Sequence, residues 1–407
     1  MDRTMHGVES ELRSRPGEGP DYAEAGKVGT APRKIAVISS YSPSLTNFRY
    51  ELLKRMVEAG HAVTAFGPED DAAVRSDLAK IGVAFVVIPM ARAGLNPLED
   101  IATVSALLKH FRKLQPDVVV PYTMKPIIYA GIAGRLANIP SRCFLITGLG
   151  HVFSDSCGAT LKGKFMRAVS VLLYRIALSG AKVIFTYNEA DDKDVKHYRM
   201  TTDDTKICRV PGSGIDLVHF GYQPPPSGRC VFLLIARLLT DKGIHDYVDA
   251  ARLVKRTVAD AEFRLLGQFD PNPAAISRKQ IEDWSSEGVI KYLGETRDVR
   301  PYLADCNVFV LPSYYREGIP RSILEALSTG RAVITTDLPG CRETVIQNVN
   351  GLLVPPRNAK ALADAMLSFV RDPTAAAQMG LESRRVAQQK FDVHDVNKTL
   401  LLRMGLV

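Results

Sequence analysis

Short runs of apolar, mostly β-branched residues alternate with longer amphipathic stretches along most of the chain. In the first half the amphipathic stretches cover 46–59, 70–80 and 97–114, and the apolar runs lie at 34–40, 61–66, 83–88, 117–120, 142–147, 182–187 and 206–210. These runs are continuously apolar instead of alternating, which indicates parallel strands covered by helices on both faces. The rhythm therefore predicts a doubly wound α/β fold, in which ligands bind beyond the carboxyl ends of the strands.

The rhythm stops once, over residues 211–229, where glycines and three consecutive prolines exclude regular structure. It restarts with apolar runs at 230–236, 262–267, 288–294, 307–312, 332–336 and 351–355. The interruption predicts two doubly wound, Rossmann-like domains that face each other across a cleft.

We expect the N-terminal domain to cover 34–215, a linker 216–229 and the C-terminal domain 230–390. Residues 391–407 are expected to form a helix that completes the second domain or packs back on the first. Residues 1–33 contain no apolar core, so we expect a disordered tail and no secretory signal.

Composition disfavours several classes of protein. The six cysteines are scattered without a CxxC pair, which argues against a disulfide framework or a zinc site and fits a reducing cytoplasm. No stretch reaches about 18 uncharged apolar residues, so we expect no membrane-spanning helix. The turn that follows 34–40 has no GxGxxG pattern, which disfavours a dehydrogenase.

The basic excess lies mainly in the first half, where residues 34–215 carry 23 Lys and Arg against 16 Asp and Glu. It suits an anionic lipid surface or a phosphorylated acceptor, and an ordinary solvated surface explains it almost as well. It lacks aromatic interleaving, so we expect no nucleic acid partner. The segment 161–178 joins an apolar stripe to four cations, and it is either a membrane-binding helix or a core helix with a basic edge; the cations are Lys162, Lys164, Arg167 and Arg175.

The segment 314–343 carries the most information about function. Pro320 suits the first turn of a helix, so Gly318 and Ile319 form the approach to a helix start. Free amides at such a start bind anions, and the missing side chain of Gly318 lets the backbone approach a ligand closely. Two arginines flank this approach, Arg316 and Arg321. Taken alone, the segment is equally well explained as a turn into an ordinary core helix.

Two other strand ends carry matching features. Arg237 and Lys242 follow the apolar run 230–236 and place two cations at its carboxyl edge, where they suit a departing diphosphate. Gly214 lies in the glycine-rich turn at 210–216, which opens onto the expected cleft. Together the three strand ends predict one phosphate-bearing ligand between the domains.

These segments resemble the donor domain of retaining GT-B glycosyltransferases of family 4. The resemblance rests on RLLTDKG at 237–243 and LPSYYREGIPRSILEALSTGRAVITTDLPGCRE at 311–343, which includes Glu317 and Glu325 separated by seven residues. In the first half it rests on NFRYELLKRMVEAGH, YTMKPIIYAGIAGRLANIP and ITGLGHVF, so that it covers roughly residues 34–390. The subgroup that it resembles most extends lipid-linked oligosaccharides and bacterial surface polysaccharides.

The resemblance implies a retaining transferase that moves a hexose or N-acetylhexosamine from a nucleotide diphosphate sugar, with UDP expected, to a lipid-linked or saccharide acceptor. Arg237 and Lys242 would bind the donor diphosphate, and Glu317 would orient the transferred sugar without acting as a nucleophile. Glu325 would accept hydrogen bonds from the ribose hydroxyls. The remaining donor-binding positions implied are Gly318, Ile319, Pro320 and Gly214. No cofactor and no metal are expected, because no apolar run ends in an Asp-x-Asp pair suited to Mg²⁺ or Mn²⁺.

On the acceptor side the resemblance implies Asn47, Lys125 and the loop that ends at His151. Many relatives carry a histidine where this chain has Thr147 and Gly148, and His151 follows on the same loop. A lone histidine beside an apolar strand is more often structural than catalytic. The enzyme is expected in the cytoplasm, at the inner face of the membrane if the segment 161–178 binds lipid.

Two alternatives stay open on the sequence alone. A sugar-nucleotide 2-epimerase can share this fold and needs no acceptor. A non-catalytic subunit of a polysaccharide assembly complex would keep the fold but lose site residues, whereas Arg237, Lys242, Glu317 and Glu325 are all present.

Overall fold

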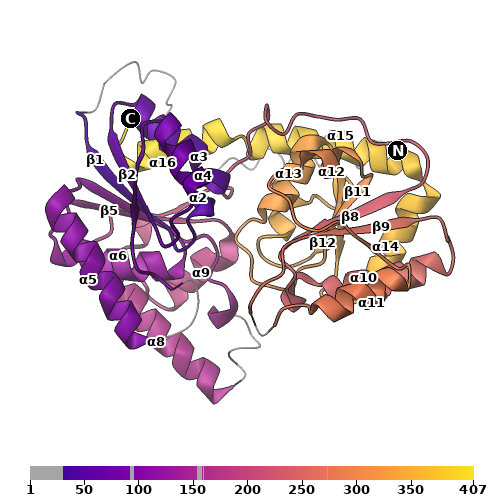
Figure 1. Cartoon of the computed structure of the whole chain (residues 1–407), viewed down its shortest axis with the longest axis horizontal. Coiled ribbons are helices and arrows are strands. Elements are labelled where there is room, and N and C mark those ends of the chain that lie inside the picture. Colours follow the sequence, from indigo (N-terminus) through magenta and orange to yellow (C-terminus); the bar gives the residue numbers. More distant parts are fainter. Residues whose placement is uncertain (1–30, 92–95, 154–157, 159, 273) are drawn as a thin grey trace.

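The computed structural model describes residues 31–91, 96–153, 158, 160–272 and 274–407, so most of the expected tail lies outside the described residues. Two α/β domains lie side by side, and the last helices of the chain run along one side of both (Figure 1). Each domain is built on one parallel sheet, as the apolar rhythm of the sequence predicts.

The N-terminal domain has a seven-stranded sheet in the order β3-β2-β1-β4-β5-β6-β7. Its strands are β1 Lys34–Ile38, β2 Ala62–Gly67, β3 Ala84–Val87, β4 Val118–Pro121, β5 Ser141–Leu145, β6 Val183–Thr186 and β7 Ile207–Arg209. Its helices are α2 Pro43–Phe48, α3 Tyr50–Glu58, α4 Ala72–Lys80, α5 Pro97–Leu114, α6 Met124–Leu136, α8 Leu161–Leu178 and α9 Glu189–His197, with short 3-10 turns η1 His151–Phe153 and η2 Asp204–Lys206.

The C-terminal domain has a six-stranded sheet in the order β10-β9-β8-β11-β12-β13. Its strands are β8 Val231–Ile235, β9 Glu262–Leu266, β10 Lys291–Tyr292, β11 Val308–Leu311, β12 Ala332–Thr336 and β13 Gly351–Val354. Its helices are α10 Ile244–Lys255, α11 Arg278–Ser286, α12 Arg300–Ala304, α13 Arg321–Thr329, α14 Ala359–Arg371 and α15 Pro373–Lys390, with 3-10 turns η3 Thr240–Lys242 and η4 Arg342–Thr344.

Both sheets are doubly wound, and the predicted fold class is confirmed. Apolar clusters cover both faces of each sheet: one face of the N-terminal sheet includes Val37 and Val120, and the other includes Ile38 and Val119. The strand order reverses between β1 and β4 in the first sheet and between β8 and β11 in the second. Loops that leave adjacent strands in opposite directions open a crevice at these points, where ligands of such sheets bind.

The chain passes between the domains at two places that pair with each other. Ile215 donates its amide to the carbonyl of Phe391 at 2.7 Å and accepts the amide of Val393 at 3.1 Å. After this crossing, helix α16 (Val393–Met404) packs against α3, and Val396 and Leu400 join the core of the N-terminal sheet. The C-terminal helix therefore lies on the first domain.

The amphipathic stretch at 46–59 forms two helices where the sequence predicts one. The break is at Arg49, which has φ −123° and separates α2 from α3. Its guanidinium is buried, donates to the hydroxyl of Tyr187 and lies 4.9 Å from the ring centre of Tyr122. Turning this side chain inward interrupts the surface helix.

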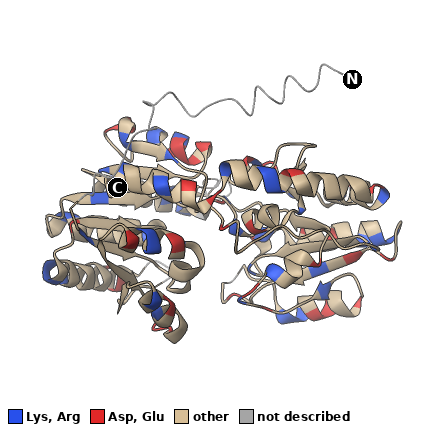
Figure 2. Cartoon of the chain, turned by 90° about the horizontal axis from the view of Figure 1, so that it is seen from above, with Lys and Arg blue, Asp and Glu red and all other residues tan. Residues whose placement is uncertain are grey.

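Lys and Arg are spread over the helices of both domains instead of forming one patch (Figure 2). Within the described part of the chain, no helix is both long and apolar enough to cross a bilayer. The same residues hold no cluster of three His, Cys, Asp or Glu side chains arranged to bind a metal ion.

Candidate functional site

The best-formed cluster of candidate residues lies where β8 and β11 end. Lys242, in the turn η3 that follows β8, forms an ion pair with Glu317, in the loop that follows β11. The hydroxyl of Ser313 donates to the same carboxylate oxygen of Glu317 at 2.9 Å. The side chains of Lys242 and Glu317 are only 14% and 11% exposed. The topological switch point of the second sheet thus holds a partly buried cation beside an oriented carboxylate.

The two loops that carry this pair are fixed to each other by backbone contacts. The carbonyl of Asp241 accepts the amides of Tyr314 at 2.9 Å and Tyr315 at 3.1 Å. Gly243 has φ +74°, and a Cβ there would overlap the carbonyl of Pro312. Glycine at this position therefore allows η3 to approach the end of β11, which sets the position of Lys242.

Arg237 lies at the carboxyl end of β8, as expected, but it does not contact the Lys242–Glu317 pair. Its guanidinium pairs with Asp270 at 2.8 Å, and its side chain is 43% exposed. Asp270 follows β9, so Arg237 is held toward the β9 side of the same sheet edge. The structure brings Lys242 and Glu317 together and places Arg237 at the rim of that edge.

The approach to helix α13 differs from the sequence prediction by one residue. Pro320 is the N-cap, with φ −64° and ψ 119°, and the first helical residue is Arg321. The extended conformation of Pro320 keeps it outside the helix, where it has no amide to leave unpaired. No side chain caps this helix start. Its amides therefore remain suited to an anion.

Glu325 lies one turn into α13 and pairs with Arg321 at 3.2 Å. Arg321 also donates to the carbonyl of Gly214 at 2.8 Å, so it links α13 to the interdomain crossing. Burial raises the pKa of Glu325, and the guanidinium of Arg321 acts in the opposite direction. A buried carboxylate with one cation and free lone pairs can accept hydrogen bonds from a ligand.

The loop of Glu317 is in direct contact with the N-terminal domain. A Cβ on Gly318 would overlap the carbonyl of Thr147, and a Cβ on Gly148 would lie 2.7 Å from the amide nitrogen of Gly318. Glycine on both sides permits backbone-to-backbone contact between the β5 loop and the β11 loop. A ligand bound by Glu317 thus lies beside both domains.

Sequence reasoning missed a set of residues at the end of β6. The amide nitrogen Nδ2 of Asn188 donates to the carbonyls of Glu317 at 3.2 Å and Gly318 at 3.4 Å. Asn188 directly follows the apolar run 182–187, so the rule that ligand sites follow strand ends could have found it. The sequence does not show that the C-terminal domain docks against Asn188.

The acceptor-side candidates are more scattered. Asn47 is exposed on α2. Lys125, at the start of α6, lies 3.4 Å from Asp100 and is mostly buried. The side chain of His151 lies outside the described residues. The geometry therefore assigns no common ligand to these three positions.

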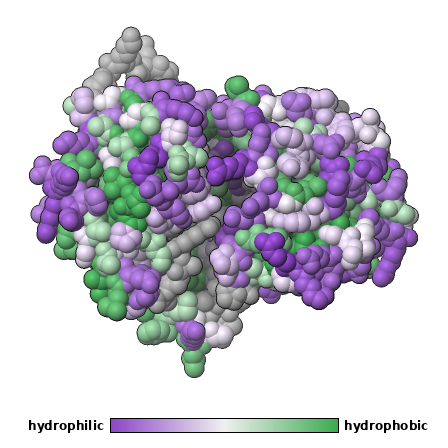
Figure 3. All heavy atoms as spheres, in the orientation of Figure 1, coloured by the Kyte–Doolittle hydropathy of each residue, from purple (hydrophilic) through white to green (hydrophobic). Residues whose placement is uncertain are grey.

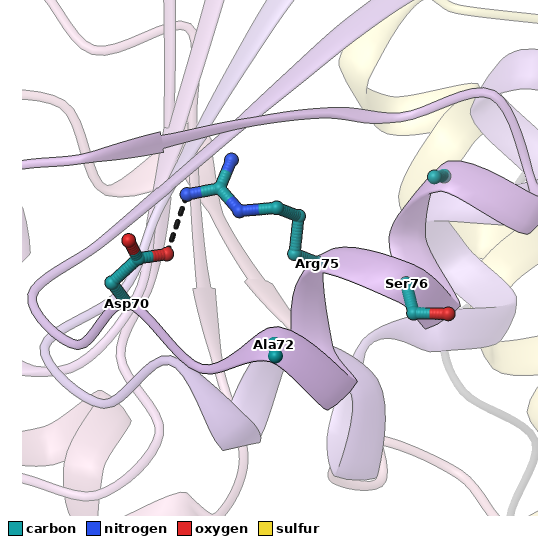
Figure 4. A pocket seen from close by; sticks show the side chains of 5 residues that line it. Asp70, Ala72, Arg75 and Ser76 are labelled. Atoms are coloured by element: carbon teal, nitrogen blue, oxygen red, sulfur yellow. Dashed lines mark hydrogen bonds and ion pairs between the residues drawn. The ribbon is translucent and has the colours of Figure 1, made fainter.

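A shallow hollow at the start of α4 lies apart from these residues. It is lined by Asp70, Ala72, Arg75 and Ser76 (Figure 4). Asp70 and Arg75 pair at 2.5 Å, and both are well exposed to solvent. The residues that line this hollow include no partly buried ion pair like Lys242–Glu317 at the β8–β11 edge.

Two family models match the chain, one in each domain. The model described as Glycosyl transferase 4-like domain matches residues 46–212, and that described as Glycosyl transferases group 1 matches residues 229–372. The matches meet at the interdomain crossing and together cover most of the two sheets.

Two curated relatives match both domains. The chain is 28% identical over 352 residues to the N,N'-diacetylbacillosaminyl-diphospho-undecaprenol alpha-1,3-N-acetylgalactosaminyltransferase of Campylobacter jejuni, covering 83% of this chain and 90% of that protein. It is 26% identical over 299 residues to the UDP-Gal:alpha-D-GlcNAc-diphosphoundecaprenol alpha-1,3-galactosyltransferase of Escherichia coli, covering 70% and 74% respectively.

Solved structures share the same two-domain fold. Anabaena HepE in complex with UDP-glucose matches with a TM-score of 0.73 and 18% identity, over 92% of this chain and 100% of that one. Sucrose-phosphate synthase from Thermosynechococcus elongatus matches with a TM-score of 0.72 and 18% identity, over 92% and 97%. At this level of identity the likeness concerns the fold.

Proposed function

The chain belongs to the group 1 glycosyltransferases and has their two-domain GT-B fold, and we propose that it transfers a hexose or N-acetylhexosamine from a UDP-sugar to a lipid-linked saccharide. The observation that carries the proposal is the Lys242–Glu317 pair beside the uncapped start of α13, at the switch point that faces the first domain. The names of the relatives support a UDP-sugar donor and a diphospho-undecaprenol acceptor.

On the donor side, Lys242 and Arg237 bind the diphosphate. Lys242 then shares its ammonium between Glu317 and a phosphate oxygen, and Arg237 reaches the diphosphate from the rim. The amides at Gly318 and Ile319 and the start of α13, next to Pro320, hold sugar hydroxyls and phosphate. Glu325 accepts hydrogen bonds from the ribose, and Gly214 holds Arg321 in place beside it.

We propose transfer with retention at the anomeric carbon. The bond from that carbon to the UDP oxygen breaks, the bond to the acceptor oxygen forms on the same face, and the acceptor proton passes to the departing phosphate. Lys242 and Arg237 stabilise the negative charge that grows on UDP, in a site that excludes much of the water. Glu317 orients the sugar and stabilises positive charge on it. We propose that the reaction needs no cofactor, since the nucleotide sugar is a substrate.

On the acceptor side, we propose that helix α8 binds the membrane that holds the lipid. Five apolar residues spaced three or four apart face solvent on one side of α8: Leu161 85%, Phe165 69%, Val169 36%, Leu172 56% and Ile176 39% exposed. Lys162 and Lys164 are exposed beside this stripe. Apolar residues colour much of the lower part of the N-terminal domain, where α5, α6 and α8 lie (Figure 3). A solvated apolar stripe edged by cations is suited to an anionic bilayer.

The test begins with nucleotide binding and ends with product analysis. A thermal-shift screen of nucleotide sugars should find a UDP-sugar, whose binding at 100 times its dissociation constant adds about 2.7 kcal/mol to the free energy of unfolding. Incubation of that donor with a diphospho-undecaprenol-linked sugar should release UDP and form an α-glycosidic bond. Donor converted to its 2-epimer without acceptor would instead support the epimerase alternative, and a chain that binds no nucleotide sugar would contradict the proposal.

A further inference from the structure

Residues at the start of helix α9 in the N-terminal domain contact the loop of Glu317 in the C-terminal domain. Asn188 caps the helix by accepting the amide of Asp191 at 2.8 Å, and its own Nδ2 donates to the Asp191 carboxylate at 2.8 Å. The same Nδ2 faces the carbonyls of Glu317 and Gly318. Asn188 and Asp191 are each only 1% exposed, so this end of α9 is sealed by the C-terminal domain and the loops around it.

Arg316 approaches the same helix from the other side of Glu317. Its Nη2 lies 2.5 Å from Oδ2 of Asp194 and 3.8 Å from Oδ1 of Asp191. Its Nη1 donates to the carbonyl of Phe153 at 2.8 Å. Among the described residues, the partners of this C-terminal-domain guanidinium are therefore groups of the N-terminal domain.

The side chain and the backbone of Glu317 are held by different domains. Its carboxylate is held by Lys242 and Ser313 of its own domain. Its backbone is held on both sides by the other domain, through Arg316 before it and through Asn188 at the carbonyls of Glu317 and Gly318. Any change in the approach of the domains thus moves the backbone of Glu317 relative to its carboxylate partners.

We propose that Asn188, Asp191, Asp194 and Arg316 form an interdomain clamp that positions Glu317 for transfer. The proposal rests on the transferase function proposed above and adds four positioning residues to it. None of the four is assigned a contact with substrate. An ion pair that is largely shielded from water, such as Arg316–Asp194, fixes geometry more firmly than an exposed pair does.

The experiment compares Arg316→Gln, Asp194→Asn and the double variant with the wild-type chain. Each single change should lower kcat by about tenfold or more, because a displacement of about 1 Å at a reacting centre is that costly. The double variant should be no slower than the slower of the two single variants, since each single change already breaks the same Arg316–Asp194 ion pair. The affinity for UDP, measured by calorimetry, should change less than twofold, because the proposed UDP contacts all lie in the C-terminal domain.

Two further measurements separate positioning from general structural support. Asp194→Glu keeps the charge and should recover part of kcat, and the midpoint of thermal unfolding of the single variants should stay near that of the wild type. Solution scattering of the ligand-free double variant should give a larger radius of gyration than the wild type. The matched control is Arg342→Gln, which removes the exposed Arg342–Asp337 pair of the C-terminal domain and should leave kcat and the radius unchanged.

Different experimental results would contradict the interdomain clamp and the proposed transferase function. A wild-type chain that binds and transfers no UDP-sugar contradicts the function. A wild-type chain that transfers sugar while both single variants keep kcat within twofold overturns the clamp. Additive losses in the double variant, or losses that match a fall in the unfolding midpoint, overturn it as well.

Discussion

The backbone of Gly148 in the N-terminal domain lies against the backbone of Gly318 in the C-terminal domain. Gly148 has φ +113°, and a Cβ there would lie 2.7 Å from the amide nitrogen of Gly318. Residues with a side chain rarely adopt this backbone conformation, and a Cβ atom this close to a backbone atom would clash with it. The two loops can meet only because both positions are glycine.

We expect Gly148→Ala to separate the two loops and to lower kcat by at least about tenfold, since Glu317 precedes the displaced amide. Steady-state kinetics with the UDP-sugar donor check this. Gly60→Ala is the matched control: Gly60 also has a positive φ, +88°, but a Cβ there meets nothing within 4 Å. This control should lose about 1–2 kcal/mol of stability and keep its activity. Equal activity of the two variants would show that the loop contact does not matter for transfer.

Lys242→Ala and Arg237→Ala should each lower turnover by well over tenfold. Each removes a cation that stabilises charge on the departing diphosphate. Lys242→Ala should be the more damaging, because it also leaves the partly buried carboxylate of Glu317 without its cation. Lys279→Ala, at an exposed position on α11, is the control. Near-normal rates in both site variants would place the diphosphate elsewhere.

The sequence predicts features that depend on neighbouring residues better than features that depend on contacts between distant residues. Continuous apolar runs predict the strands, since burial on both faces of a parallel sheet needs no knowledge of distant residues. The strand-end rule also indicates Lys242 and Glu317, although it does not show that they pair. The role of Asn188 cannot be predicted from the sequence, because it depends on how the two domains dock. Asn188 and its partner Glu317 are 129 positions apart in the chain. Arg49 splits a predicted helix for the same reason, since its partner Tyr187 lies just after strand β6, far away in the sequence.

Glu325→Gln should weaken UDP binding while stabilising the ligand-free chain. Burial raises the pKa of Glu325, because its surroundings disfavour the charged carboxylate. Glutamine removes that charge and one acceptor for the ribose hydroxyls. The unfolding midpoint should therefore rise without UDP, and the additional rise on adding UDP should be smaller than in the wild type. Glu58→Gln, an exposed change on α3, should alter neither. A Glu325→Gln chain that binds UDP as the wild type does would remove Glu325 from the donor site.

Asp191 should make the stability of the chain depend on pH. Burial raises its pKa to about 7, from an ordinary value near 3.8, and Arg316 only partly offsets this. Between these values the folded chain keeps a proton that the unfolded chain has released, so the free energy of unfolding falls as the pH rises from about 4 to about 7. Among the described residues, the other charged or titratable groups that act on Asp191 are Asp194 and Tyr174.

Unfolding midpoints of Asp191→Asn and wild type, measured across this range, check that dependence. The midpoint of Asp191→Asn minus that of the wild type should grow from pH 4 to 7 and stay constant above, because both states of the wild type are then deprotonated. A difference that does not change with pH would show that Asp191 titrates near its ordinary pKa.

We expect the exposed apolar stripe on α8 to bind the membrane that holds the lipid-linked acceptor. Phe165 is 69% exposed beside the exposed Lys164, so Phe165→Asp places a carboxylate in the middle of the apolar stripe and opposes both hydrophobic insertion and attraction to anionic lipid. We expect the wild type to sediment with anionic liposomes at moderate salt and Phe165→Asp to remain in the supernatant. Val218→Asp is the control, because Val218 is 88% exposed and lines a hollow with Asp298 and Arg300 of the C-terminal domain. If α8 serves only to reach the lipid-linked acceptor, Phe165→Asp should slow transfer to a liposome-embedded acceptor and leave transfer to a short-chain, water-soluble acceptor unchanged. Equal sedimentation of all three proteins would mean that the stripe has another occupant.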